Sequence, residues 1–162
     1  MATMPDPYSL RRHHPAVREY GYEKTSEKDT GYNCVAWAAG MTTCHWWPLQ
    51  IMTDDCYWPP NAPCNDERVE TFVTAFATLG YQPCADGSLE IGFEKVAIYV
   101  KSGTVVHMAR QLEDGRWTSK WGGMGIDFAH RIEALEDSAK HGPSSYGKVA
   151  QYLRRKHSYQ ET

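Results

Sequence analysis

An alternating pattern in the second half of the chain constrains the fold more than any other feature of the sequence. Apolar side chains recur at every second position in Lys95-Val96-Ala97-Ile98-Tyr99-Val100, which predicts a strand, and Ser102-Gly103 is a hairpin turn after it. A second strand is predicted over 104–112 and a third over 116–121, with Glu, Asp and Gly in the turn between them. Three strands joined by short turns predict an antiparallel meander.

Helices are expected before and after this meander. A short helix is predicted over 34–40, ended by a Gly. A longer one is predicted over 65–80, because an Asn can cap it, apolar residues recur at helical spacing, and a Gly stops it. Two more are expected over 128–137 and 146–156. The fold class is therefore α+β, with the first helix packed on the antiparallel meander.

The length predicts one domain with a sizeable core rather than two, since the chain has 162 residues. Residues 1–24 are rich in Pro, Arg, His and Tyr without periodicity, and we interpret them as an extended N-terminal arm laid over the surface. Residues 25–157 are expected to form a single α+β domain, and residues 158–162 a C-terminal tail.

Composition and charge argue against several functions. The net charge of -3, from 17 basic and 20 acidic residues, argues against a nucleic-acid partner. The sequence has no apolar run of membrane-spanning length and no signal-peptide layout at its start, so no membrane is expected as a partner. The five cysteines are then expected to be reduced in the cytoplasm, although export that needs no signal peptide stays open. No Cys-x-x-Cys pair occurs, so a structural zinc site is not predicted. No other metal site and no cofactor are expected.

Cys34 is the first candidate for chemistry. It lies in Gly31-Tyr32-Asn33-Cys34-Val35-Ala36-Trp37, where a small-residue turn leads into the first predicted helix. The positive end of the helix dipole and the unpaired N–H groups of a first turn stabilise thiolate over thiol. The competing interpretation is a buried cysteine that packs as a small apolar side chain, which is the commoner situation.

His107 is the second candidate, because it interrupts the apolar strand segment Val105-Val106-His107-Met108-Ala109. Burying an imidazole costs free energy unless it is hydrogen-bonded, so a partner is expected. The partner is the Cys34 thiolate in the catalytic interpretation, whereas in the other interpretation His107 is a satisfied core residue. A base also needs a group that orients its far nitrogen. The candidates for this group are Thr118, Ser119 and Asp127. Asp127 has a simpler role as a helix cap.

The segment 42–63 is dense in aromatic residues and contains prolines that preclude a regular helix. Its rings must be buried somewhere, so this long loop is expected to be ordered. Trp46, Trp47 and Trp58 either line a substrate cleft or cover the core, and covering the core is the favoured interpretation.

Two of these segments resemble a known superfamily. Tyr32-Asn33-Cys34-Val35-Ala36-Trp37 resembles the start of the catalytic helix in NlpC/P60 and CHAP amidases, which belong to the papain-like superfamily. Residues 96–109 resemble the paired strands of NlpC/P60. This resemblance implies a papain-like fold with Cys34 as nucleophile. It also implies that Lys95 occupies the usual position of the catalytic His, and that His107 occupies the position of the third, orienting residue.

A different register is similar to papain itself. His107 then opens the strand that bears the base, and Trp117-Thr118-Ser119-Lys120-Trp121-Gly122 is similar to papain's Asn-Ser-Trp-Gly segment, with Ser119 in place of the Asn. This register implies a Cys34–His107 dyad, and it is the one we favour. The Gln that papain uses for its oxyanion hole has no counterpart, because no Gln precedes Cys34.

The favoured function is therefore a papain-like thiol enzyme that acts on a peptide or protein amide, as a peptidase, amidase or deamidase. Cys34 would attack the carbonyl carbon and His107 would carry the proton. The backbone N–H of Cys34, with Asn33 or a tyrosine such as Tyr32, would bind the oxyanion. The alternative is a catalytically inactive papain-like scaffold that binds a peptide or protein through its aromatic loop, which Lys95 favours. The oligomeric state does not follow from the sequence.

Overall fold

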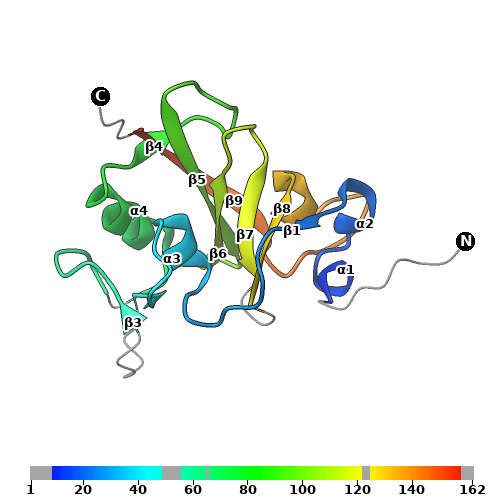
Figure 1. Ribbon diagram of the computed structural model, residues 1–162, viewed down its shortest axis with the longest axis horizontal. Coiled ribbons are helices and arrows are strands. Elements are labelled where there is room, and N and C mark those ends of the chain that lie inside the picture. The colour runs from blue at the N-terminus through cyan, green and yellow to red at the C-terminus, as the bar shows by residue number, and fades with distance from the viewer. Residues whose placement is uncertain (1–8, 49–55, 65, 122–124, 158–162) are drawn as a thin grey trace, which may run out of the picture.

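The computed structural model describes residues 9–48, 56–64, 66–121 and 125–157 (Figure 1). These residues form a seven-stranded sheet in which every neighbouring pair is antiparallel. Across the sheet the order is β1 (Glu23–Lys24), β8 (Ile126–His130), β7 (Trp117–Trp121), β6 (Thr104–Gln111), β5 (Phe93–Lys101), β9 (Lys148–Lys156) and β4 (Gln82–Cys84). The α+β class is therefore confirmed.

The predicted meander is β5, β6 and β7. Ser102 and Gly103 join the first two strands with φ of 53° and 80°. Positive φ at both central residues is typical of the type I′ turn, whose twist matches the twist of paired strands. The alternating pattern and this turn chemistry are local, which explains why the sequence predicted the hairpin.

Two core clusters lie on opposite faces of the sheet, because successive side chains of a strand point to opposite sides. Core A contains Ile98, Met108 and Phe72, and it lies against α3 (Cys34–Ala38) and α4 (Val69–Ala77). Core B contains Tyr99, Trp117 and Phe128, among others. Figure 1 shows α3 and α4 on one side of the sheet and the two N-terminal helices on the other.

The N-terminal region differs from the extended arm that we expected. From Leu10 it forms two short helices, α1 (Leu10–His13) and α2 (Val17–Tyr20). Leu10 and Val17 are buried in core B, and His14 between them is buried as well. The segment has few apolar residues, but those it has are buried against the face of the sheet opposite α3.

Two expected helices are strands in the structure. The segment expected as a helix over 146–156 contains β9, which pairs with β5 along its length and inserts between β5 and β4. The segment over 128–137 contains most of β8 and the 3₁₀ helix η1 (Ile132–Leu135). Both are rich in helix-forming residues, and long-range pairing overrides that local preference.

The remaining elements are small. A parallel pair of two-residue strands, β2 (His45–Trp46) and β3 (Cys56–Tyr57), lies in the aromatic segment. The longer predicted helix is α4, although its expected cap, Asn65, lies outside the described residues. Arg68 occupies the N-cap position, without a side-chain hydrogen bond.

Candidate functional site

Cys34 is the first residue of α3, and Asn33 fixes it there. The Asn33 Oδ1 atom accepts hydrogen bonds from the backbone N–H of Ala36, at 3.0 Å, and of Trp46, at 3.0 Å. Its Nδ2 atom donates to the carbonyl oxygen of Trp46, at 2.8 Å. Asn33 therefore caps the helix and ties its start to β2, as expected from the preference of Asn for helix N-caps.

The cysteine helix lies over β6 and β7, where these strands separate. Among the described residues the two strands pair only at Arg110–Thr118 and at Gln111–Trp117. Beyond this point no backbone ladder joins them, and the side chains of His107 and Ser119 take its place. The expectation that the cysteine helix packs on the meander is met here.

A chain of hydrogen bonds runs through the buried side chains of His107, Ser119 and His130. His107 Nε2 lies 2.8 Å from Ser119 Oγ, which lies 2.7 Å from His130 Nε2. The chain ends where His130 Nδ1 lies 2.7 Å from the carbonyl oxygen of Arg131. Ser119, expected to orient His107, therefore contacts it directly.

The direction of this chain fixes the tautomer of each imidazole. A carbonyl oxygen only accepts, so the Nδ1 atom of His130 carries a hydrogen and its Nε2 atom accepts from the Ser119 hydroxyl. The Ser119 oxygen in turn accepts from the Nε2–H of His107. The lone pair of His107 then lies on Nδ1, which is buried and has no hydrogen-bond partner among the residues that the structure describes. His107 is thus held in the form of a base with a free lone pair.

No hydrogen bond joins Cys34, at the start of α3, to His107 on β6. Cys34 is half-buried and packs against core A, whereas the His107 ring contacts Tyr99 and Tyr146 on the core B side. The backbone of Met108, the residue after His107, faces the sulfur. The thiol and the imidazole therefore lie on the two faces of the sheet, in the region where β6 and β7 separate.

The electrostatics favour a neutral pair at rest. Burial raises the pKa of the Cys34 thiol above its ordinary value, and the backbone of Met108 partly opposes that rise. Burial also lowers the pKa of His107 well below its ordinary value, with smaller contributions from His130 and His14. At neutral pH the site therefore holds a thiol and a neutral imidazole rather than the thiolate that the helix dipole alone would favour.

The side chains expected to bind an oxyanion are engaged elsewhere. The amide of Asn33 is used by the backbone of Trp46. Tyr32 donates its hydroxyl hydrogen to Asp127 Oδ2 at 2.9 Å, and its ring lies under the ammonium group of Lys120, 3.8 Å from the ring centre. Both residues position the turn that leads into Cys34. This corrects the expectation that their side chains bind the oxyanion.

Asp127 does not orient His107 and does not cap a helix. It lies on β8, where its carboxylate accepts from Tyr32 and lies 4.0 Å from Lys120 Nζ. Side chains alternate along a strand, so Asp127 projects from the face opposite to its neighbour Phe128 of core B. Asp127 therefore supports the Tyr32 turn.

The three tryptophans of the aromatic segment 42–63 pack in or against core A. Trp46 and Trp58 are 2% and 5% exposed, and both contact the phenylalanines of α4. Trp47 is partly buried, with its ring 5.4 Å from the ring of Phe72. These rings cover the core, which is the interpretation that the sequence favoured. The alternative, in which they line a substrate cleft, is wrong for Trp46 and Trp58 because both are buried.

Lys95 is buried near the start of β5 and takes part in ion pairs. Its ammonium group lies 3.2 Å from Glu90 Oε1 and 3.5 Å from Asp86 Oδ1, and donates to the carbonyl oxygen of Asp86 at 3.0 Å. These partners belong to the loop between β4 and β5, not to α3. Lys95 therefore holds that loop rather than facing Cys34.

Three residues of this site were missed by the sequence interpretation. His130 lies in the segment expected as a helix over 128–137, His14 lies in the expected N-terminal arm, and none of His14, His130 and Tyr146 was predicted as a residue of this site. The Tyr146 ring lies parallel to His107, with centres 3.9 Å apart, and 4.3 Å from the ring of His14. No local sequence pattern indicates these residues. Strand pairing and the packing of segments that are distant in sequence bring them together.

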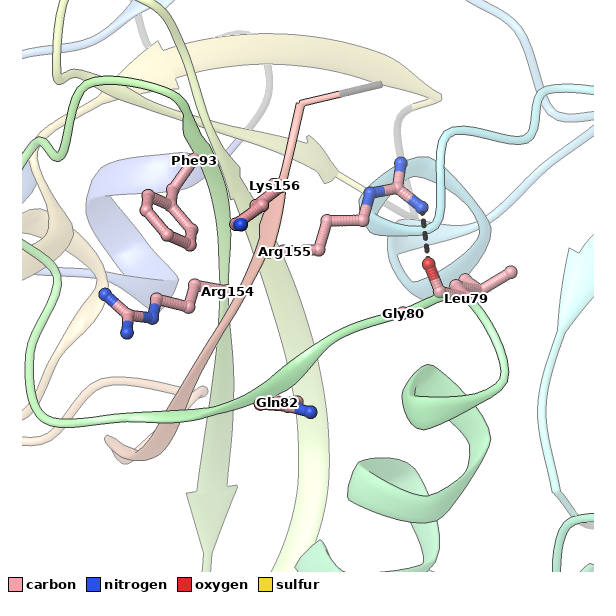
Figure 2. Close-up of a pocket in the computed structure, with 7 residues that line it drawn as sticks. All are labelled: Leu79, Gly80, Gln82, Phe93, Arg154, Arg155 and Lys156. Atoms are coloured by element: carbon pink, nitrogen blue, oxygen red, sulfur yellow. Dashed lines mark hydrogen bonds between the residues drawn. The ribbon is translucent and has the colours of Figure 1, made fainter. Parts of the chain in front are cut away.

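Other surface features lie away from this site. A hollow of about 580 Å³ at the end of β9 is lined by Leu79, Gly80, Gln82, Phe93, Arg154, Arg155 and Lys156 (Figure 2). Its arginines are already paired, Arg154 with Glu90 and Arg155 with Glu94. Within the described ranges, no group of three or more His, Cys, Asp or Glu side chains is arranged to hold a metal ion. No helix in the same ranges is long and apolar enough to cross a membrane.

Comparison with protein families matches residues 23–154 to a family described as a domain of unknown function, DUF7689. The chain belongs to the DUF7689 family. The part that matches DUF7689 includes Cys34, His107, Ser119 and His130, and it leaves His14 outside. Comparisons with curated proteins and with solved structures give no match.

Proposed function

We propose that the protein is a cysteine-dependent enzyme that cleaves or transfers an amide, with Cys34 as nucleophile and His107 as general base. One observation carries this proposal: the hydrogen-bonded chain through Ser119 and His130 leaves His107 with an unpaired lone pair on Nδ1. A core histidine that served packing alone would be expected to have both ring nitrogens satisfied.

The arrangement also supports assignment to the papain-like superfamily, which forms part of the proposal. The cysteine begins a helix that packs on an antiparallel sheet, and the histidine lies on a neighbouring strand. The Nε2 atom of His107 is held by Ser119, the residue in the place of papain's Asn in the favoured register. This contact supports the roles of base and orienting group that the register implies for His107 and Ser119.

The proposed reaction proceeds through an acyl-enzyme. As Cys34 Sγ attacks the carbonyl carbon, its proton passes to His107 Nδ1 and the carbonyl oxygen becomes an oxyanion. The carbon–nitrogen bond then breaks, the proton passes from His107 to the leaving nitrogen, and a thioester remains on Cys34. Water, or another amine in a transfer reaction, attacks the thioester and restores the thiol. His107 takes the proton of this second nucleophile and returns it to sulfur.

A neutral thiol and a neutral imidazole suit this general-base route. Because the pKa of Cys34 is raised and that of His107 is lowered, no ion pair is formed beforehand, and the proton moves as the substrate is attacked. The absence of a Cys34–His107 hydrogen bond fits a site without substrate, since catalytic hydrogen bonds often tighten only on binding.

Acetylation by p-nitrophenyl acetate tests the dyad without knowledge of the natural substrate. The rate of p-nitrophenolate release at pH 7 would be measured together with mass spectrometry of the peptide that carries Cys34. We expect Cys34→Ala to abolish the fast phase and His107→Gln to slow it by about 10²–10⁴-fold, the usual contribution of general-base catalysis. The matched control Cys64→Ala removes an exposed cysteine and should leave the fast phase unchanged.

An acetylation rate of Cys34 that is the same in His107→Gln and in the wild type would refute the dyad. If His107→Gln does not unfold cooperatively, Ser119→Ala replaces it, because that change keeps the imidazole and removes only its orienting partner. An unchanged rate in Ser119→Ala would likewise count against the proposal.

The inactive scaffold is the second candidate. The raised pKa of the Cys34 thiol favours it, because a protonated thiol is a poor nucleophile. Its expected binding surface is reduced, however, since Trp46 and Trp58 are buried in core A. A Cys34 that reacts no faster than Cys64 in the acetylation experiment would favour this candidate.

A further inference from the structure

Tyr146 occupies the centre of the aromatic cluster around His107. Its ring is stacked on the His107 ring with an angle of 4° between the planes. The ring of His14 lies near it at 4.3 Å, and Trp121 meets its ring edge to face at 5.8 Å. With Tyr99, whose ring centre is 6.0 Å away, four aromatic neighbours surround the tyrosine ring among the described residues.

The backbone on both sides of Tyr146 is held in place by close contacts with the sheet and with Leu135. Gly147 has a φ of 66°, and a Cβ atom there would clash with the carbonyl oxygen of Val100. The Ser144 hydroxyl accepts the Tyr146 N–H at 3.3 Å and donates to the carbonyl oxygen of Leu135 at 2.6 Å. The segment is therefore pinned against the sheet before and after the tyrosine.

His14 is tied into the same segment. Its Nδ1 atom lies 2.6 Å from the Ser144 oxygen. Because that hydroxyl donates to Leu135, its oxygen accepts here, and the hydrogen of His14 lies on Nδ1. The Nε2 atom of His14 then carries a lone pair and, like Nδ1 of His107, has no hydrogen-bond partner within the described part of the chain. Two buried imidazoles with unpaired nitrogens therefore flank the tyrosine, which is unusual unless a ligand completes the site.

The Tyr146 hydroxyl is itself uncommitted. It makes no hydrogen bond to another of the described residues, although the backbone N–H of Tyr146 is bonded. Burial raises the pKa of Tyr146 well above its ordinary value, and the charge of a Cys34 thiolate nearby raises it further. The hydroxyl therefore stays protonated at any working pH and remains a hydrogen-bond donor.

The other side chains considered as oxyanion donors are occupied, Asn33 by the backbone of Trp46 and Tyr32 by Asp127. We propose that the Tyr146 hydroxyl donates a hydrogen bond to the carbonyl oxygen of the substrate attacked by Cys34. The assignment rests on the proposed function and adds to it a catalytic residue that contacts the reacting group. The hydrogen bond strengthens as the carbonyl oxygen gains negative charge, which lowers the barrier to attack.

Two reagents separate this role from an effect on the thiol itself. With p-nitrophenyl acetate, the bond from Cys34 sulfur to the carbonyl carbon forms, an oxyanion develops, and the bond to p-nitrophenolate then breaks. With iodoacetamide, sulfur displaces iodide at a saturated carbon, and no oxyanion develops. We expect Tyr146→Phe to slow acetylation by about tenfold or more and to leave alkylation unchanged, because one lost oxyanion donor costs up to about 10²–10³-fold.

Tyr99→Phe is the matched control. Tyr99 is a buried tyrosine of the same cluster, but its hydroxyl donates to the carbonyl oxygen of Ile132, away from Cys34. This change should leave the ratio of acetylation to alkylation rates at its wild-type value. Thermal unfolding of both variants shows whether the cluster is intact, and the retained ring keeps the stack on His107 in Tyr146→Phe.

The outcomes distinguish the tyrosine from the dyad. A wild-type ratio in Tyr146→Phe overturns the assignment of the tyrosine, and so does an equal slowing of both reactions. If His107→Gln slows acetylation while Tyr146→Phe keeps the wild-type ratio, the dyad stands and the tyrosine assignment alone fails. If neither variant slows acetylation, the proposed function fails with it.

Discussion

At the scale of single residues, Asn33 has more influence on Cys34 than its neighbours in the sequence indicate. One side chain caps α3, holds β2 and precedes the thiol directly. Its cap role could be predicted, because Asn before a helical run is a common N-cap. Its bond to Trp46 could not, because that contact depends on the path of the intervening loop.

The variant Asn33→Asp separates two effects of residue 33 on Cys34: the capping of α3 and the effect of a nearby charge on the thiolate. The carboxylate still accepts from the backbone N–H groups but cannot donate to Trp46, and its negative charge disfavours a thiolate at the next residue. We expect alkylation of Cys34 by iodoacetamide at pH 7 to slow severalfold, with the rate reaching its plateau at higher pH. Asn33→Ser, which keeps a neutral cap, is the control, and an equal rate in both variants would contradict the electrostatic argument.

The histidines show where sequence interpretation stops at this scale. Ser119 and His107 lie on adjacent strands of a predicted meander, so their contact could be anticipated from the sequence. His130 could not be placed, because its segment was expected as a helix. His14 lies in a polar stretch without periodicity, and only the docking of α1 and α2 brings it into the core.

At the scale of elements, local chemistry decided what could be predicted. The β5–β6 hairpin has a period of two and a turn that suits its twist, so its pattern was sufficient. The segment of β9 contains Ala, Leu, Gln and Arg, which favour a helix when considered alone. Its strand conformation comes from pairing with β5 and β4, which are distant in sequence. Long-range partners leave no mark in a single sequence.

Gly147 offers a test at this scale, because it sets the approach of the segment before β9 to the sheet. Gly147→Ala adds a methyl group in the left-handed region and against the Val100 carbonyl, so the segment must shift. We expect the free energy of unfolding in urea to fall by about 2 kcal/mol or more, the sum of a backbone penalty and a steric one.

Gly142→Ala is the matched control for this change. Gly142 also has a positive φ, of 92°, but a Cβ atom there meets open space. It should lose about 1 kcal/mol, the backbone penalty alone. Equal losses in the two variants would show that the approach to Val100 is not tight.

At the scale of the whole molecule, the buried histidines make stability depend on pH. Burial lowers the pKa of His14 to about 3 and that of His130 to about 4, and it lowers the pKa of His107 as well. In the unfolded chain each would titrate near pH 6.5. Between these values the unfolded chain binds more protons than the folded one, so the free energy of unfolding falls as the pH falls.

We therefore expect stability to be greatest above pH 6.5 and to decline from there toward pH 4, by up to about 1.4 kcal/mol per pH unit for each histidine. Urea unfolding at several pH values measures this slope. His130→Gln should reduce it, whereas His45→Gln, which removes an imidazole that does not contribute to these lowered pKa values, should not. A slope that is the same in the wild type and in His130→Gln would contradict the prediction.

The position of β9 inside the sheet has a consequence for how the chain is made. Until residues 148–156 leave the ribosome, β5 has an open edge where β9 belongs, and β4 has no partner. An open apolar edge is a template for pairing with other chains. The sheet therefore cannot be completed during synthesis of the earlier strands, and a chain interrupted before β9 would be prone to aggregation rather than partly folded.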